Sequence, residues 1–407
     1  MSGSQKHRSA RKIFVVILVL TALSVAAGLS FYKPTIQPKM TSRPAPHAVQ
    51  TTASKTAISM LLTGDWIAHD SANAAAKQPD GSYNYLPLVD VYAPLFKHTD
   101  IKFCNDPILN GGSALGITGY PKFNSPTEFV SNMGAFGCNL VNTASNHSFD
   151  FAQANIDASV DAWSKVPRML AVAGENRSQG EHDTIHYFDT RGVKFAFLAY
   201  TAYSNTPPQN GYGVNVYTKD IAASQIQTAK TAGAQFVIVS MRWGVEYSPT
   251  ISVSQQTIAQ DLSDAGAKLV LGHGPHVLQP VEQLTGKTGN KTLVWYSLGN
   301  FLNTQEPPQT LFNGVAQLTI DPKNLSITPT GFLPFYMHYE WTPEQAKADD
   351  TNARTAVKMY LLENTTQPMI DAQQLHTTVT EQKARLEATL NAKGVKVPLL
   401  TSRQLGF

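Results

Sequence analysis

The chain has 407 residues, of which 42% are hydrophobic, which is enough for one large buried core or for one large domain with appendages. Its formal net charge of +3 is unevenly distributed, because residues 1–56 contain eight Lys or Arg and no acid, so the remaining chain carries −5. The basic balance belongs to the N-terminal arm. Nucleic-acid binding by the folded part is therefore not expected.

The N-terminus has the pattern of a membrane anchor. Residues 1–12 contain four cations, and residues 13–31 are apolar and uncharged, nearly long enough to span a hydrocarbon core of about 30 Å. Cations favour the cytoplasmic side, so we predict a cytoplasmic tip, a single-pass transmembrane signal anchor, and a main domain outside the cell membrane. A cleaved signal peptide is the alternative, since Val25 and Ala27 fit small-residue cleavage positions. Both interpretations export the protein.

Residues 32–56 are rich in Pro, Thr, Ser, Lys and Ala and lack hydrophobic periodicity. Such a segment buries too little apolar area to offset chain entropy, so it is predicted to be a flexible linker. The folded domain is then expected over residues 57–341, followed by a helical extension over residues 342–407.

Short apolar runs of strand length alternate with helical patterns after the linker. Their bulky, largely β-branched or aromatic content suits strands that are buried on both faces. This alternation implies a layered α/β fold. The predicted strands are Ile58–Thr63, Ile101–Cys104, Leu140–Ala144, Val193–Tyr200, Phe236–Met241, Lys268–Leu271 and Leu293–Leu298.

One helix between these strands has clear start and stop signals. Residues 125–128 (SPTE) provide a capping serine, a proline for the first turn and an acid, and Gly137 is a typical end. Phe129, Met133 and Phe136 share one face of this predicted helix.

The two cysteines are Cys104 and Cys138. Export permits a disulfide. However, Cys104 is expected late in one strand and Cys138 just before the next parallel strand, which would place them at opposite ends of the sheet. We therefore expect two buried free thiols.

Polar residues follow nearly every predicted strand. Loops at the carboxyl ends of strands meet at one crevice in open α/β sheets, so these clusters predict a single site. Carboxylate, amide and imidazole groups are ligands that Mn²⁺, Fe or Zn²⁺ sites use. The clusters contain Asp65, Asn105 and Asp106, Asn146 and His147, Arg242, His273 and His276, and Asn300.

The order of these clusters resembles that of the CapA family of poly-γ-glutamate capsule proteins, which share the calcineurin-like metallophosphoesterase fold. The resemblance extends from about residue 58 to 305 and implies an α/β/β/α sandwich. Its blocks are LLTGDW (61–66), FCNDP (103–107), ASNHSFDF (144–151), SMRWGVEY (240–247), LGHGPHVLQPVE (271–282) and WYSLGNF (295–301).

The resemblance also implies roles for individual residues. One or two divalent metal ions (Mn, Fe or Zn) would be held by Asp65, Asp106, Asn146, His273 and His276, with Asn105 as the alternative to Asp106. His147 would act as the catalytic acid, and Asp150 would orient it. Arg242, Glu246 and Asn300 would contact substrate, and Arg242 would assist catalysis.

Three departures from the family pattern concern the metal. Arg242 stands where the family has a lone His, one extra residue separates His273 from His276, and position 67 is Ile in place of a second His. An arginine cannot ligate a cation but can clamp a phosphate or carboxylate. The other interpretation of Arg242 is a buried pair with Glu246 or Asp150.

The C-terminal stretch differs in kind from the strand–helix alternation. Residues 342–365 read as one helix and residues 378–392 as another, packed on the sandwich as a peripheral layer. A partner-binding helical hairpin is the alternative.

Two functions fit these expectations. The first is a metal-dependent hydrolase or transferase that acts on an anionic envelope polymer or its precursor. The second is a non-catalytic, polymer-binding component of capsule export with a degraded metal site. Either could work beside other capsule-export membrane proteins, and neither involves nucleic acid.

Overall fold

The computed structural model describes residues 57–407, which belong to one compact unit. The predicted cytoplasmic tip, anchor and linker lie outside the described residues. Within the described part of the chain, no helix is both long enough and apolar enough to cross a membrane.

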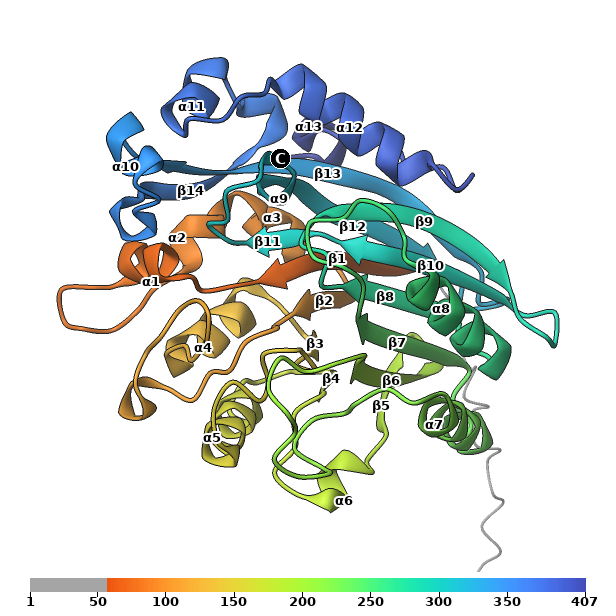
Figure 1. The fold of residues 1–407 in the computed structure, drawn as a ribbon. Helices are drawn as coiled ribbons and strands as arrows, with labels where there is room; N and C mark the ends of the chain where they lie inside the picture. Colours follow the sequence, from red (N-terminus) through yellow and green to blue (C-terminus); the bar gives the residue numbers. More distant parts are fainter. Residues whose placement is uncertain (1–56) are drawn as a thin grey trace, which may run out of the picture. The chain divides into compact units, whose positions relative to one another are not determined.

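Two sheets form the centre of the unit (Figure 1). The larger sheet has the order β14 (Thr355–Leu361), β13 (Ile327–Glu340), β12 (Phe312–Ile320), β1 (Ile58–Trp66), β2 (Ile101–Asn105), β3 (Leu140–Asn142) and β4 (Ala171–Ala173), with β11 (Asn300–Leu302) beside β1. The smaller sheet has the order β5 (His186–Thr190), β6 (Val193–Thr201), β7 (Phe236–Arg242), β8 (Leu269–His273), β10 (Lys291–Leu298) and β9 (Leu278–Thr285).

Parallel pairing joins the strands that were predicted from their apolar runs. β1 to β4 are parallel to one another, as are β6, β7, β8 and β10. All seven predicted strands are confirmed within a few residues. The strands without a sequence prediction are β4, β5, β9 and β11 to β14, and several of them are short or lie at a sheet edge.

The alternation of side chains along β6 separates two apolar cores. Phe195 and Phe197 belong to the core that also contains the residues of β1 and β2. Ala196 and Leu198 point to the opposite face and pack with Ile226 of α7 (Lys219–Thr231) and with residues of α8 (Val253–Ala265). The two sheets therefore share one core, and helices cover an outer face, which confirms the predicted α/β class.

Helices also lie on the other side of the sheets. Figure 1 shows α4 (Thr127–Phe136) and α5 (Gln153–Ser164) on the side opposite α7 and α8. In α4 the predicted apolar face is buried, and Gly137 ends the helix with φ +121°. The remaining helices are α1 (Asp70–Ala76), α2 (Leu86–Val89), α3 (Ala93–Phe96), α6 (Gln179–His182), α9 (Pro308–Leu311), α10 (Pro343–Lys347), α11 (Gln367–Ala372), α12 (Val379–Asn391) and α13 (Ser402–Leu405).

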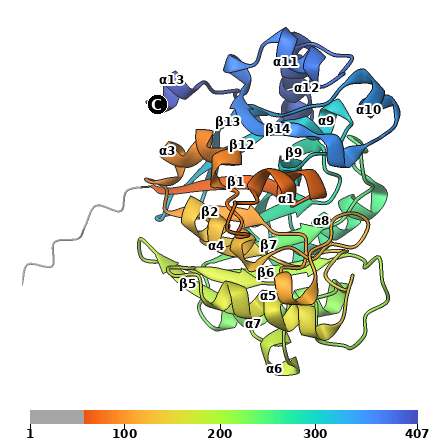
Figure 2. The ribbon, with the colours of Figure 1, turned by 90° about the vertical axis from the view of Figure 1, so that its left-hand side faces the viewer.

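The prediction of one helix over residues 342–365 is wrong. The one α-helix described there is α10, of five residues, beside two short 3-10 helices, η3 (Thr351–Ala353) and η4 (Leu362–Asn364). β14 pairs antiparallel with β13 as an edge strand. The reason is visible in β14 itself, where Val357, Met359 and Leu361 alternate as buried residues with more exposed ones, which is the period of a strand. The second predicted helix is confirmed as α12. Figure 2 shows α11 and α12 beside β13 and β14, far from α5 and α6.

The prediction of two free thiols is also wrong, because Cys104 and Cys138 form a disulfide. Their Cα atoms are 5.8 Å apart. Cys138 does not lie in line with the start of the strand, since its N–H still donates to the carbonyl of Met133 in α4. The end of α4 therefore holds Cys138 against the face of the sheet, beside Cys104.

Candidate functional site

The carboxyl end of β1 carries Asp65, which is fully buried. The parallel register places Asp65 beside Asn105 of β2 on one side and Asn300 of β11 on the other. Asn105 Nδ2 donates a 2.6 Å hydrogen bond to Asp65 Oδ1. The strand ends thus bring these three predicted residues together.

His276 lies against this group. Its Nδ1 is 2.7 Å from Asp65 Oδ2 and 3.0 Å from Asn300 Oδ1, and its Nε2 is 3.8 Å from Glu246 Oε1. Burial alone would lower the pKa of His276, but Asp65 and Glu246 outweigh burial and raise this pKa to about 9. His276 in turn lowers the pKa of Glu246 to about 2. At neutral pH His276 is therefore a cation between two carboxylates.

Arg242 is buried at the end of β7, with 1% of its surface exposed. Its Nε donates to Asn146 Oδ1 at 2.8 Å, and its Nη2 donates to Glu246 Oε1 at 3.1 Å. Gly274, with φ +110°, makes room for the guanidinium, because a Cβ on this residue would lie 1.7 Å from Arg242 Nη1. Of the partners considered from the sequence, Arg242 pairs with Glu246, whereas Asp150 pairs with His147.

His147 is held by Asp150. The distance from His147 Nδ1 to Asp150 Oδ2 is 2.7 Å, and the same oxygen accepts a 2.8 Å hydrogen bond from the N–H of Phe123. On the other side of the ring, Nε2 lies 3.4 Å from Asn205 Nδ2. Asp150 therefore fixes the ring orientation and leaves Nε2 as the basic nitrogen.

His273 is buried in the interior below this group. Its Nε2 is 2.6 Å from Ser240 Oγ, and its ring stacks on Phe103 with 5.5 Å between centroids. Burial is the main cause that lowers the pKa of His273 to about 4, so the ring is neutral. Its Nδ1 has no hydrogen-bond partner among the described residues.

Asp106 does not join the other predicted ligands. Its carboxylate accepts hydrogen bonds from Asn110 Nδ2 at 2.7 Å and from Trp163 Nε1 at 3.0 Å, and burial raises its pKa to about 7. The sequence left open whether Asn105 or Asp106 joins the site. In the structure Asn105, and not Asp106, contacts Asp65.

A cavity of about 410 Å³ opens at these strand ends. Four of the predicted site residues line it: Asn146, His147, Glu246 and His276. The other predicted site residues that the structure describes do not line the cavity. Residues that the sequence did not indicate complete the lining, among them His69, Asp70, Tyr120, Phe123, Tyr247, Glu306, Asp349 and Arg354.

Arg354 is the most informative of the unpredicted lining residues. Its guanidinium pairs with Glu306 at 2.6 Å and lies over the ring of Trp341 at 4.4 Å. It enters from the segment before β14, which was expected to be helical, so no sequence signal pointed to it. The cavity wall carries the acids Asp70, Glu246, Glu306 and Asp349 against the cations His276 and Arg354.

The donors do not fit a divalent metal in this arrangement. The Asn146 oxygen already accepts from a cationic guanidinium, the Asp65 carboxylate already pairs with the charged His276, and Asp106 lies elsewhere. Within residues 57–407, no group of three or more His, Cys, Asp or Glu side chains is placed to hold a metal ion. A metal bound here would have to displace both positive charges from the ligand oxygens.

Solved structures with a similar fold include Haemophilus influenzae NAD nucleotidase, with a TM-score of 0.44 at 14% identity over 84% of this chain and 64% of that one. A calcineurin-like phosphoesterase of Bacillus subtilis, YfkN, has a TM-score of 0.38 at 15% identity over 67% of this chain and 88% of that one. Similarities at this level carry no information about activity.

Among curated proteins, the chain is similar to the PGA biosynthesis protein CapA of Bacillus subtilis, at 29% identity over 57% of this chain and 59% of that protein. It is also similar to the capsule biosynthesis protein CapA of Bacillus anthracis, at 30% identity over 49% of this chain and 50% of that protein. The chain thus matches between half and three-fifths of the length of these relatives. Residues 59–305 match the family model described as bacterial capsule synthesis protein PGA_cap, and the chain belongs to that family.

Proposed function

We propose that this protein acts outside the cytoplasm, anchored in the cell membrane by residues 13–31, in the synthesis or export of poly-γ-glutamate or another anionic envelope polymer. Family membership and the names of the two CapA relatives support the role in capsule formation. The basic tip followed by an apolar stretch supports the location. Other membrane proteins of capsule export are the proposed partners.

We infer further that the site works without a divalent metal. The observation that carries this inference is the 2.8 Å hydrogen bond from Arg242 Nε to Asn146 Oδ1, in a buried setting. A guanidinium stays charged at all accessible pH values, so it holds a fixed positive charge on the oxygen expected to ligate the metal. The favoured role is that of a polymer-handling component rather than a metallohydrolase.

A metal-independent proton transfer is the second candidate, and the His147–Asp150 pair favours it. Asp150 accepts from Nδ1, so Nε2 can take the proton of an attacking amine or water and return it to a departing amine. The acidic side chains of the cavity wall suit an ammonium group, such as the amino end of a glutamyl chain. A glutamyl amide is the corresponding substrate class.

The role in capsule formation is tested by deleting the gene in the source cell and measuring extracellular anionic polymer. Loss of polymer, restored by the parent gene, is expected. Unchanged polymer after deletion would contradict the proposed function. Complementation with His147→Ala separates the two candidates, because a handling role keeps polymer output and a proton-transfer role loses it.

A further inference from the structure

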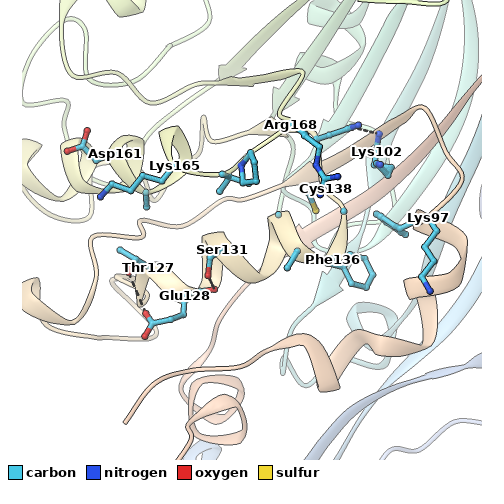
Figure 3. A pocket seen from close by; sticks show the side chains of 18 of the residues that line it. Lys97, Lys102, Thr127, Glu128, Ser131, Phe136, Cys138, Asp161, Lys165 and Arg168 are labelled. Carbon is cyan, nitrogen blue, oxygen red and sulfur yellow. Dashed lines mark hydrogen bonds between the residues drawn. The ribbon is translucent and has the colours of Figure 1, made fainter. Parts of the chain in front are cut away.

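A second and larger cavity, seen from close by in Figure 3, is lined by residues at the amino ends of β2 and β3. Its volume is about 1090 Å³. Lys102 at the start of β2 and Cys138 just before β3 line it, whereas Asp65 and Asn105 stand at the carboxyl ends of their strands. Its walls are α4 and α5, with small residues such as Gly134 and Ala158 between them. The two cavities are therefore separate.

Four cations line this cavity: Lys97, Lys102, Lys165 and Arg168, which together we call the basic groove. Among the described residues, none of the four forms an ion pair with an acid. The lining acids are Glu128 and Asp161, and Asp161 is already paired with Arg177 at 2.5 Å. In Figure 3, Arg168 and Lys102 lie close together, away from Glu128.

The placement of Lys102 and Arg168 is energetically unfavourable. Burial first and the nearby Arg168 charge second lower the pKa of Lys102. Arg168 also has a positive φ of 62°, a backbone conformation that non-glycine residues rarely adopt. Asp100 opposes the lowering of the Lys102 pKa, but its carboxylate is paired with Arg191 at 2.8 Å. The neighbouring charges of Lys102 and Arg168 therefore still favour an anion that neutralises them.

The spread of these cations points to a chain of anionic groups rather than to one small anion. Lys97 and Lys102 come from the segment that joins α3 to β2, and Lys165 and Arg168 from the segment that joins α5 to β4, so two separate segments supply two charges each. The disulfide to Cys104 fixes Cys138 in the lining beside Lys102. The candidate site, by contrast, has more acids than cations in its wall and is a poor place for a polyanion.

We propose that the basic groove is a docking site for a polycarboxylate chain, in which successive carboxylates meet Lys102, Arg168 and Lys165. The groove holds the polymer at the amino ends of the strands, apart from the candidate site at their carboxyl ends. The proposed function supplies only the identity of the polymer used as probe.

The test measures binding of fluorescently labelled poly-γ-glutamate to the full-length protein in detergent, by anisotropy at two salt concentrations. The groove variant is Lys102→Gln/Lys165→Gln/Arg168→Gln. Its control is Lys230→Gln/Lys383→Gln/Lys396→Gln, which removes the same charge from exposed lysines on α7, on α12 and after α12. At least tenfold weaker binding is expected in the groove variant and less than twofold in the control. Added salt should weaken binding by the parent more than binding by the groove variant.

A conservative variant, Lys102→Arg/Lys165→Arg, should keep the parent affinity, which separates lost charge from a damaged fold. Equal affinity of the parent and the groove variant would overturn the proposal, as would no binding by the parent. Binding of anionic phosphatidylglycerol vesicles through the groove, without binding of the polymer, would assign it to a lipid surface and overturn it as well. The gene deletion tests the proposed function separately. Its failure can therefore be distinguished from failure of the basic-groove proposal.

Discussion

The Nε of Arg242 donates a 2.8 Å hydrogen bond to Oδ1 of Asn146, and Arg242 is almost completely buried. The same guanidinium also binds Glu246. The resemblance to the family predicts Asn146 as an amide ligand and a histidine ligand at position 242. Arg242 therefore stands in place of one expected metal ligand and occupies the oxygen of another, Asn146. For this reason we propose that the site is metal-free.

Replacing Arg242 with histidine should create metal affinity. Arg242→His removes the positive charge from Asn146 and supplies an imidazole at the position where the family has one. We expect bound Zn²⁺ or Mn²⁺ at a level that the parent lacks, measured by elemental analysis after dialysis. The control is Arg242→Met, which removes the charge without adding a ligand. Equal metal content in Arg242→His and Arg242→Met would contradict the ligand argument.

Gly274→Ala should destabilise the protein strongly. The new Cβ would lie 1.7 Å from Arg242 Nη1, and the residue has φ +110°. The displaced guanidinium and the backbone strain together are expected to lower the free energy of unfolding by about 2–4 kcal/mol. Gly233→Ala is the matched control, because φ is +88° there but nothing lies within 4 Å of the added Cβ. It should cost only about 1 kcal/mol. Chemical denaturation measures both, and similar losses would show that the contact with Arg242 is unimportant.

The charge on His276 should make stability depend on pH. Its pKa is raised from 6.5 to about 9 in the folded protein, so its contribution is complete below pH 6.5 and is lost as pH rises to about 9. The loss should be on the order of 3 kcal/mol at most. Unfolding free energies of the parent and His276→Gln, measured from pH 6 to 10, should converge as pH rises. A constant difference between the two proteins would contradict the pairing with Asp65.

The disulfide between Cys104 and Cys138 should stabilise the folded protein. It closes a loop with a sequence separation of 34 residues, for which chain entropy gives about 3–4 kcal/mol. We expect Cys104→Ala/Cys138→Ala to lose a free energy of this size, measured by denaturation without reductant. The parent with added reductant should match the variant. A parent that is insensitive to reductant and equal to the variant would mean that the bond does not form.

Much of the site could be predicted because strand ends are readable from sequence. Asp65 and His147 stand at strand ends of the larger sheet, which parallel pairing brings to one side. His276 follows β8 of the smaller sheet, and the packing of the two sheets places it beside them. The choice between Asn105 and Asp106 could not be made in the same way, since neighbouring residues of an extended strand point to opposite faces and the sequence did not fix the register.

Other features depended on contacts between distant segments. Cys138 meets Cys104 because α4 packs on the sheet face, which the order of elements does not reveal. Arg354 reaches the cavity from the segment before β14, although its sequence surroundings read as helical. The strand-like alternation of Val357, Met359 and Leu361 in β14, which pairs with β13, was the signal that the helical interpretation missed.

The central claim is tested most directly by the metal content of the full-length protein, made without chelator and then supplied with Mn²⁺, Fe²⁺ or Zn²⁺. Elemental analysis beside the Asn146→Ala and His273→Ala variants should find no metal in the parent above the level of the two variants. One or two equivalents in the parent, absent from both variants, would contradict the metal-free site and restore the metal-dependent hydrolase or transferase as the better account.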